Sequence, residues 1–238
     1  MCRMIFAAGK FELSQLIDNL ILMAKGENAF HEKNQELGSY QHTHGWGIAY
    51  LDHGKWIIKK SEKTIFEDPE IDELREVKTN LAVLHVRRAT NGTVSYDNTH
   101  PFHQQDYVFC HNGIIRSKIG YDSHFHTEGK TDSEKFFYSL LTEIENEPEV
   151  ITAIRKDVQT YQDYTSLNFI LAGTEKSYAY SLSQNLFQYH QMELSVNKEL
   201  IIISSEKLNL PNLQWNALEQ GDIVTINNQT LETSINKR

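Results

Sequence analysis

The order of apolar segments along the chain is the feature that most constrains its fold. Short apolar or alternating runs, typical of strands, lie on both sides of a single pair of helical patterns. The helical pair is expected at residues 136–144 and 148–160. The strands are expected at residues 3–8, 45–51, 56–60, 81–86, 107–110, 167–172, 177–182, 186–192, 200–204 and 222–226. This order predicts an α+β fold, in which two mainly antiparallel sheets carry helices on their outer faces.

Two further helices are predicted in the first third of the chain. Leu13, Leu16, Ile17 and Leu20 have helical spacing, which predicts an amphipathic helix over residues 13–25 that stops at Gly26. A second helix is predicted over residues 69–78, with a proline near its start. In the middle of the chain, Thr131 followed three residues later by Glu134 is typical of a helix start.

Composition limits the class of protein. The 238 residues contain four scattered prolines and no repeat or linker, so we expect a single domain over residues 2–238. A net charge of −9 argues against a nucleic-acid-binding role. No apolar run approaches the ~20 residues of a membrane span, and we expect no membrane association. Two cysteines do not form a disulfide framework, so the cytoplasm is the expected compartment.

Cys2 is the first candidate functional residue. Cysteine is small enough for an aminopeptidase to remove Met1, which would leave a thiol and a free α-amine on one residue. An N-terminal amine can activate its own side-chain nucleophile. Taken alone, a cysteine at position two can also arise by chance.

Three later segments each offer polar groups at the end of an apolar run. Arg87, close to Thr90, could clamp a carboxylate through its guanidinium fork. Asn112 and the backbone N–H of Gly113 could form an oxyanion hole. Asp132 could hold a substrate ammonium group. The simpler alternatives are a surface arginine, an Asn-Gly turn and a helix-capping carboxylate.

Together these groups match the parts of glutamine, and the segments that contain them resemble the class II glutamine amidotransferases. The resemblance rests on Cys2 and six motifs in family order across about residues 2–208. They are Gly45-Trp46-Gly47, His85-x-Arg87-x-Ala89-Thr90, Asn98-Thr99-His100-Pro101-Phe102, His111-Asn112-Gly113, Thr131-Asp132-Ser133-Glu134 and Ser204-Ser205-Glu206. The chain is most similar to the stand-alone glutaminase-like branch, which includes the γ-glutamyl hydrolase of ergothioneine biosynthesis.

The resemblance implies an N-terminal nucleophile hydrolase fold, a four-layer αββα sandwich. It implies that Cys2 is the nucleophile, with its amine as the base, and that Asn112 and Gly113 form the oxyanion hole. Arg87 and Thr90 would bind the substrate α-carboxylate, and Asp132 the α-amine. The Ser205-Glu206 stretch would help line the site, and residues 45–47 would be scaffold beside the nucleophile. No metal or organic cofactor is implied.

The chain departs from the family pattern at four positions. Arg3 replaces a common glycine, His44 a common acid, and Asn91 a common histidine, while Arg88 stands where tryptophan or another residue occurs. None of these changes removes a catalytic group. A second arginine at position 88 could suit an additional anionic group on the substrate.

Other reactive side chains receive simpler interpretations. His124 and His126 could ligate a metal on a strand, but no acid or cysteine shares a familiar ligand spacing with them. We predict no metal site. His100 is expected to hydrogen-bond within its loop, and Cys110 to be an inert core thiol.

The sequence therefore predicts hydrolysis of the side-chain amide of glutamine, or of a γ-glutamyl amide, through a thioester on Cys2. Ammonia could pass to a separate synthase subunit, or the chain could act alone on a small-molecule substrate. Two alternatives remain open: a hydrolase of another acylated amine on the same fold, and a non-enzymatic regulatory subunit.

Overall fold

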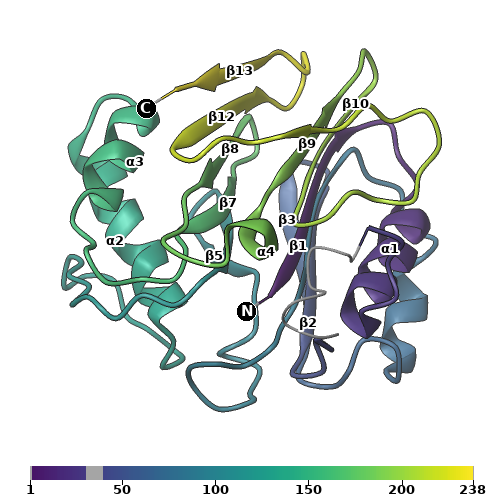
Figure 1. Ribbon diagram of the computed structural model, residues 1–238, viewed down its shortest axis with the longest axis horizontal. Coiled ribbons are helices and arrows are strands. Elements are labelled where there is room, and N and C mark those ends of the chain that lie inside the picture. The colour runs from purple at the N-terminus through teal and green to yellow at the C-terminus, as the bar shows by residue number, and fades with distance from the viewer. Residues whose placement is uncertain (1, 31–39, 238) are drawn as a thin grey trace.

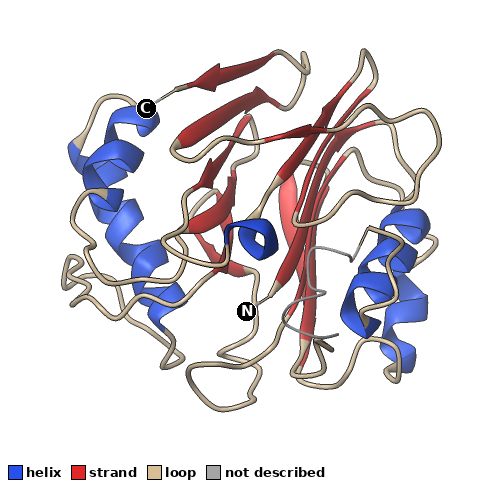
Figure 2. Ribbon diagram, viewed as in Figure 1, coloured by secondary structure: helices blue, strands red, loops and turns tan. Residues whose placement is uncertain are grey.

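Two β-sheets packed face to face form the centre of the molecule, and helices cover both outer faces (Figures 1 and 2). The computed structural model describes residues 2–30 and 40–237. The prediction of two antiparallel sheets with helices outside is confirmed, since every pairing between the named strands is antiparallel in this part of the chain.

The first sheet has the strand order β11-β9-β10-β1-β4-β2-β3. Its strands are β1 (Arg3–Gly9), β2 (Trp46–Asp52), β3 (Lys55–Ser61), β4 (Leu81–Val86), β9 (Glu193–Val196), β10 (Leu200–Ser204) and β11 (Asn216–Ala217). Strand β1, which directly follows Cys2, lies between β4 and β10, with Ile5 opposite Leu84 on one side and Ser204 on the other. The residue that precedes β1 is therefore held at the end of a central strand.

The second sheet has the order β13-β12-β8-β7-β6-β5. Its strands are β5 (Phe102–Gln104), β6 (Tyr107–Asn112), β7 (Asn168–Ala172), β8 (Lys176–Ser181), β12 (Asp222–Asn227) and β13 (Thr233–Asn236). An apolar cluster fills the space between the two sheets, with Met4 and Phe6 from β1 and Cys110 from β6 among its members. The alternating apolar residues of both sheets thus meet at one inner interface.

The helices divide between the two outer faces. Helix α1 (Leu13–Lys25) and the 3₁₀ helix η2 (Pro69–Leu74) pack against the first sheet, and α2 (Asp132–Asn146) and α3 (Val150–Val158) against the second. A short helix, α4 (Phe187–His190), precedes β9. No helix among the described residues combines the length and apolar character that a bilayer span requires.

Local signals in the sequence explain where two of these helices begin and end. Helix α1 ends at Gly26, whose positive φ of 72° suits glycine and whose N–H caps the carbonyl of Met23. Helix α2 begins after Thr131, whose hydroxyl oxygen accepts a hydrogen bond from the Glu134 N–H at 3.2 Å. The predicted helix start is confirmed. The Glu134 carboxylate instead accepts from the N–H groups of Glu128 and Gly129, and so orders the preceding loop.

Two of the predicted elements need correction, and four short strands were missed. The predicted strand at residues 186–192 is wrong, because Leu186 adopts a left-handed conformation and the short helix α4 follows it. The predicted helix at 69–78 is the shorter η2, with Asp68 as its N-cap. The short strands β5, β9, β11 and β13 were not predicted.

Candidate active site

Cys2 lies where the ends of the two sheets come together. It precedes β1 of the first sheet, and its backbone nitrogen donates a hydrogen bond to Asn112 Oδ1 at 2.8 Å. Asn112 is the last residue of β6 in the second sheet. The Cys2 side chain is buried, and Met1 lies outside the described residues. Because the Asn112 oxygen accepts this bond, its side-chain NH₂ group is left to donate elsewhere.

Gly113 is packed too closely for any larger residue. A Cβ atom at this position would collide with the carbonyl of Ser166 and with the His111 ring. The simple Asn-Gly hairpin turn is not what the structure shows, since β6 ends at Asn112 and its next strand partner is β7, beginning at Asn168. The backbone of residue 113 is therefore fixed beside Asn112.

His111 links the end of β6 to two neighbouring segments of the chain. Its Nε2 lies 3.0 Å from the Ser166 carbonyl oxygen and its Nδ1 lies 2.9 Å from the Ser133 hydroxyl. A carbonyl only accepts, so Nε2 carries the proton and Nδ1 accepts from Ser133. Burial lowers the pKa of His111, although the charge of Asp132 opposes this shift. A neutral imidazole thus ties β6 to the start of α2.

Arg87 organises the loop that follows β4. Its guanidinium is buried and donates to the carbonyl oxygens of Asn91 and Thr93, each at 2.9 Å. Burial lowers the pKa of Arg87, while Cys2 and Asp132 favour its charged form. Two of its five N–H donors are used in these bonds within the loop, and Arg87 also lines a cavity.

Asp132 is fixed in place through both carboxylate oxygens. Oδ2 accepts from the Ile115 N–H at 2.7 Å, and Oδ1 accepts from the Asn91 side chain at 3.1 Å. Asp132 is also the first residue of α2, where the helix dipole favours a negative charge. The position of Asp132 at the start of α2 is therefore compatible with a role in binding a substrate ammonium group.

One cavity brings together five of the six residues predicted for the site. Cys2, Arg87, Thr90, Gly113 and Asp132 line it. The sixth, Asn112, contacts the cavity region through its bond to Cys2. Arg88 also lines the cavity, and its guanidinium stacks 3.7 Å from the centre of the Tyr40 ring. Arg87 and Asp132, which were predicted from separate motifs, thus line the same cavity as Cys2.

Arg3, for which the motifs predicted no role, contacts the backbone of Cys2. Its side chain is fully buried, and Nε contacts Glu206 Oε1 at 2.7 Å. Its Nη1 donates to the carbonyls of Cys2 and Tyr189, and the guanidinium lies 3.9 Å from the Tyr189 ring centre. Ser205 and Glu206 were predicted to help line the cavity. Instead they contact β1, where Ser205 accepts a hydrogen bond from the Met4 N–H and Glu206 accepts one from Arg3. A charged residue inside an apolar strand was the signal that could have revealed this network.

Asn91 and His44 also have supporting roles that the sequence did not reveal. Asn91 orients Asp132, and His44 Nδ1 accepts a hydrogen bond from the Ala89 N–H at 3.0 Å. Burial, followed by the charge of Arg87, lowers the pKa of His44, so the ring accepts as a neutral imidazole. These two substitutions relative to the family pattern stabilise the same loop.

One of the remaining candidates, His100, also lines this cavity. Cys110 is buried between the sheets, and burial raises the pKa of its thiol well above the ordinary value. His124 pairs with Asp122 and Glu145 at the surface. His100 lies against the ring of His85 rather than in a loop hydrogen bond that the structure records. Within residues 2–30 and 40–237, no group of three or more His, Cys, Asp or Glu side chains is arranged to hold a metal, and the metal-free site stays a prediction.

Comparisons with known proteins agree with this geometry. Residues 28–195 match the family model of the class II glutamine amidotransferases. An uncharacterized protein of Methanocaldococcus jannaschii is 26% identical and covers 89% of this chain, which spans 67% of that relative. The glutamine–fructose-6-phosphate aminotransferase of Francisella tularensis is 23% identical over 78% of this chain.

Some relatives are considerably longer than this chain. It spans 50% of a relative from Haemophilus influenzae and 31% of the Francisella enzyme. Among solved structures, the class II glutamine aminotransferase domain protein of Silicibacter pomeroyi superimposes with a TM-score of 0.66 at 18% identity, covering 99% of both chains. At that identity the likeness shows the fold, whereas the family match covers more than half of the sequence. The chain therefore belongs to an enzyme family, the class II glutamine amidotransferases.

Proposed function

We propose that the chain hydrolyses the side-chain amide of glutamine, or of a γ-glutamyl amide, with Cys2 as an N-terminal nucleophile. The observation that carries this proposal is the 2.8 Å contact between the Cys2 nitrogen and Asn112 Oδ1. Once Met1 is removed, that nitrogen becomes the α-amine of the nucleophile. The base would then be held by the same side chain that offers its NH₂ group to the substrate oxygen.

The proposed reaction proceeds in two stages. The α-amine takes the thiol proton, and the thiolate attacks the amide carbon. The Asn112 side chain and the Gly113 N–H stabilise the tetrahedral oxyanion. The protonated amine gives its proton to the leaving nitrogen, and a glutamyl thioester remains. Water then attacks the thioester, with the amine as base, to give glutamate and the free thiol.

Substrate recognition follows from the charges on the two sides of the cavity. Arg87 and Thr90 would bind the α-carboxylate, and Asp132 would bind the α-ammonium group. Glutamine and γ-glutamyl amides share both groups. A hydrolase of other acylated amines would not need this pair of opposite charges.

The fate of the released nitrogen distinguishes two forms of the proposal. With glutamine, ammonia is released and could serve a separate synthase subunit. The much longer Francisella relative, of which this chain spans 31%, supports the idea that such a domain can work beside an acceptor-modifying part. With a γ-glutamyl amide, an amine is released and the chain could act alone.

Glutamate release from glutamine by the purified protein is the direct test. An intact mass must first establish that Met1 is absent, and Cys2→Ala serves as the matched inactive control. Release by the wild type alone would support the proposal. If the processed wild type releases glutamate from neither glutamine nor substituted γ-glutamyl amides, the proposal is wrong.

A further inference from the structure

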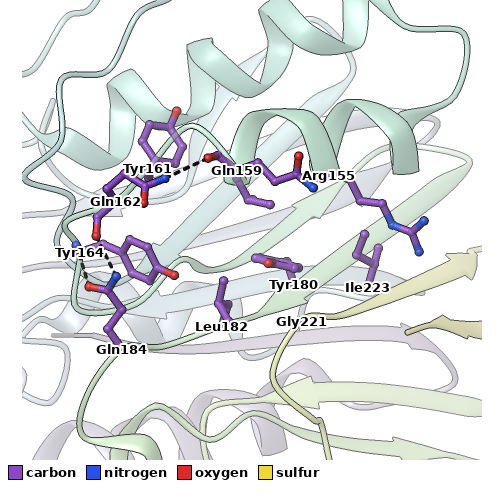
Figure 3. Close-up of a pocket in the computed structure, with 11 residues that line it drawn as sticks. Arg155, Gln159, Tyr161, Gln162, Tyr164, Tyr180, Leu182, Gln184, Gly221 and Ile223 are labelled. Atoms are coloured by element: carbon purple, nitrogen blue, oxygen red, sulfur yellow. Dashed lines mark hydrogen bonds between the residues drawn. The ribbon is translucent and has the colours of Figure 1, made fainter. Parts of the chain in front are cut away.

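A second cavity of about 400 Å³ lies on the far side of the second sheet from the first sheet (Figure 3). It is bounded by the C-terminal end of α3, the loop that follows α3, and strands β8 and β12. It shares no lining residue with the cavity that contains Cys2. We call it the tyrosine cavity, lined by Tyr161, Tyr164, Tyr180, Leu182, Ile223 and the rim residues named below.

The walls of the tyrosine cavity combine aromatic rings with a polar rim. Tyr164, Tyr180 and Ile223 are buried and form an apolar interior, whereas the rim is exposed. The rim consists of Gln159, Gln162, Gln184 and Arg155. A space of this size with apolar walls and a few polar groups is typical of a small-molecule site.

Arg155 gives the rim its charge. Its Nη2 donates to the Lys237 carbonyl at 3.0 Å, and no carboxylate of the described residues pairs with it. A guanidinium at the mouth of an aromatic slot favours a planar ligand that has an anionic group at one end. The amide side chains of the rim can meet polar edges of such a ring.

The loop that forms one wall of this cavity is hydrogen-bonded directly to residues 114 and 115, which follow Gly113. Tyr164 pairs with Ile115 as an antiparallel bridge, and Thr165 exchanges two 2.9 Å hydrogen bonds with Ile114. The Ile115 N–H in turn holds Asp132. Movement of the loop would therefore reach the proposed ammonium-binding carboxylate.

A second connection runs through the next residue of the loop. The Ser166 carbonyl accepts from His111 Nε2, and the Gly113 backbone packs against that same carbonyl. On the cavity side, Gln184 accepts from the Tyr164 N–H at 3.2 Å and donates to the Gln162 carbonyl at 2.8 Å. A ligand that displaces Gln184 would thus act on the segment between the two cavities.

We propose that the tyrosine cavity is a second binding site, for a planar aromatic anion, and that its occupation changes substrate binding through residues 162–166. The second half of this inference rests on the proposed amide hydrolysis, whereas the binding half does not. Coupling of this kind is reciprocal, so substrate must change the affinity of the second ligand by the same factor.

The binding half is tested with 2-naphthoate as the probe and 2-naphthol as its neutral analogue, by isothermal titration calorimetry. We expect saturable one-site binding of 2-naphthoate that is at least fivefold tighter than binding of 2-naphthol. Arg155→Gln, at an exposed position, should remove this preference, and Arg75→Gln on the opposite helical layer should not. Leu182→Trp should fill the cavity and abolish binding. Absence of binding, or equal binding by Arg155→Gln and the wild type, would overturn the site.

The coupling half is tested by the KM for the substrate in saturating 2-naphthoate. We expect at least a twofold change in KM for the wild type and none for Arg155→Gln, whose KM without the probe should match the wild type. Binding of 2-naphthoate with an unchanged KM would overturn the coupling alone. A protein that binds the probe but hydrolyses no glutamyl amide would instead contradict the proposed function and leave the binding site standing.

Discussion

At the scale of single residues, Asp132 combines a fixed position with a charge. Both of its oxygens accept hydrogen bonds from the protein, so its orientation does not depend on a ligand. Asparagine has nearly the same shape but no charge, so an Asp132→Asn substitution tests the charge while the position of the side chain is kept.

We expect Asp132→Asn to raise the KM for glutamine roughly 10²-fold, because removing one partner of a buried charge pair costs about 2–5 kcal/mol. The effect on kcat should be smaller, since the proposed nucleophile and oxyanion-hole residues are retained. Steady-state kinetics provide the measurement, with the exposed Asp72→Asn as the control. Unchanged kinetics for Asp132→Asn would favour the acylated-amine alternative.

Arg3 gives a prediction on stability. Its buried guanidinium contacts Glu206 at 2.7 Å, so Arg3→Met would leave a buried carboxylate without this cation. We expect the free energy of unfolding to fall by about 3 kcal/mol. Urea denaturation measures this change. The matched substitution Arg75→Met, in a more exposed ion-pair network, should cost about 1 kcal/mol or less.

At the scale of elements, the turn after β6 depends on a close approach between two backbone segments. Gly113→Ala would drive a methyl group into the Ser166 carbonyl, so one segment must move. We expect kcat to fall roughly 10²–10³-fold through loss of an oxyanion-hole donor. Gly120→Ala is the control, because a Cβ atom there would meet nothing within 4 Å. Equal activity of the two variants would argue against the assigned role of residue 113.

The pair of helices on the second sheet is joined through a buried acid. Asp157 on α3 accepts hydrogen bonds from Ser139 on α2 at 2.6 Å and from Tyr161 at 3.0 Å. Burial raises its pKa from the ordinary 3.8 to about 7, against the opposing effect of these hydrogen bonds. Between those pH values the folded protein holds a proton that the unfolded chain has lost.

Stability from this group should therefore fall as the pH rises from about 4 to 7. Relative to Asp157→Asn, the wild type should lose at most roughly 4 kcal/mol of unfolding free energy over that range. Urea denaturation at pH 4.5 and pH 8 measures the difference between the two proteins. A difference that does not depend on pH would contradict the raised pKa.

At the scale of the whole molecule, the sequence predicted the layers better than their connections. Alternating and continuous apolar runs marked most strands, because burial of one or both faces imposes those patterns. Residues 186–192 were also predicted as a strand, yet residues 187–190 form α4. There the Tyr189 carbonyl accepts from Arg3 and the His190 carbonyl from Asn168, and such long-range contacts leave no local signal.

The candidate site shows the same division. Residues whose chemistry is exposed in a motif, such as Arg87 and Asp132, were predicted and lie on one cavity. Residues that act through them were missed. Asn91 and Arg3 resemble ordinary polar residues until the fold brings Asp132 and Glu206 within reach.

The central position of β1 also has a consequence for the order of events during synthesis. Its two neighbours, β4 and β10, follow it in the chain by some 80 and 200 residues, so β1 cannot be paired on both sides until β10 has been made. Long-range pairing of this kind is slow. Until it occurs, Cys2, which the fold later buries, remains open to solvent. Cys2 on the first sheet and Asn112 on the second thus meet only when both sheets have assembled, so the proposed chemistry is delayed until the whole sandwich has formed.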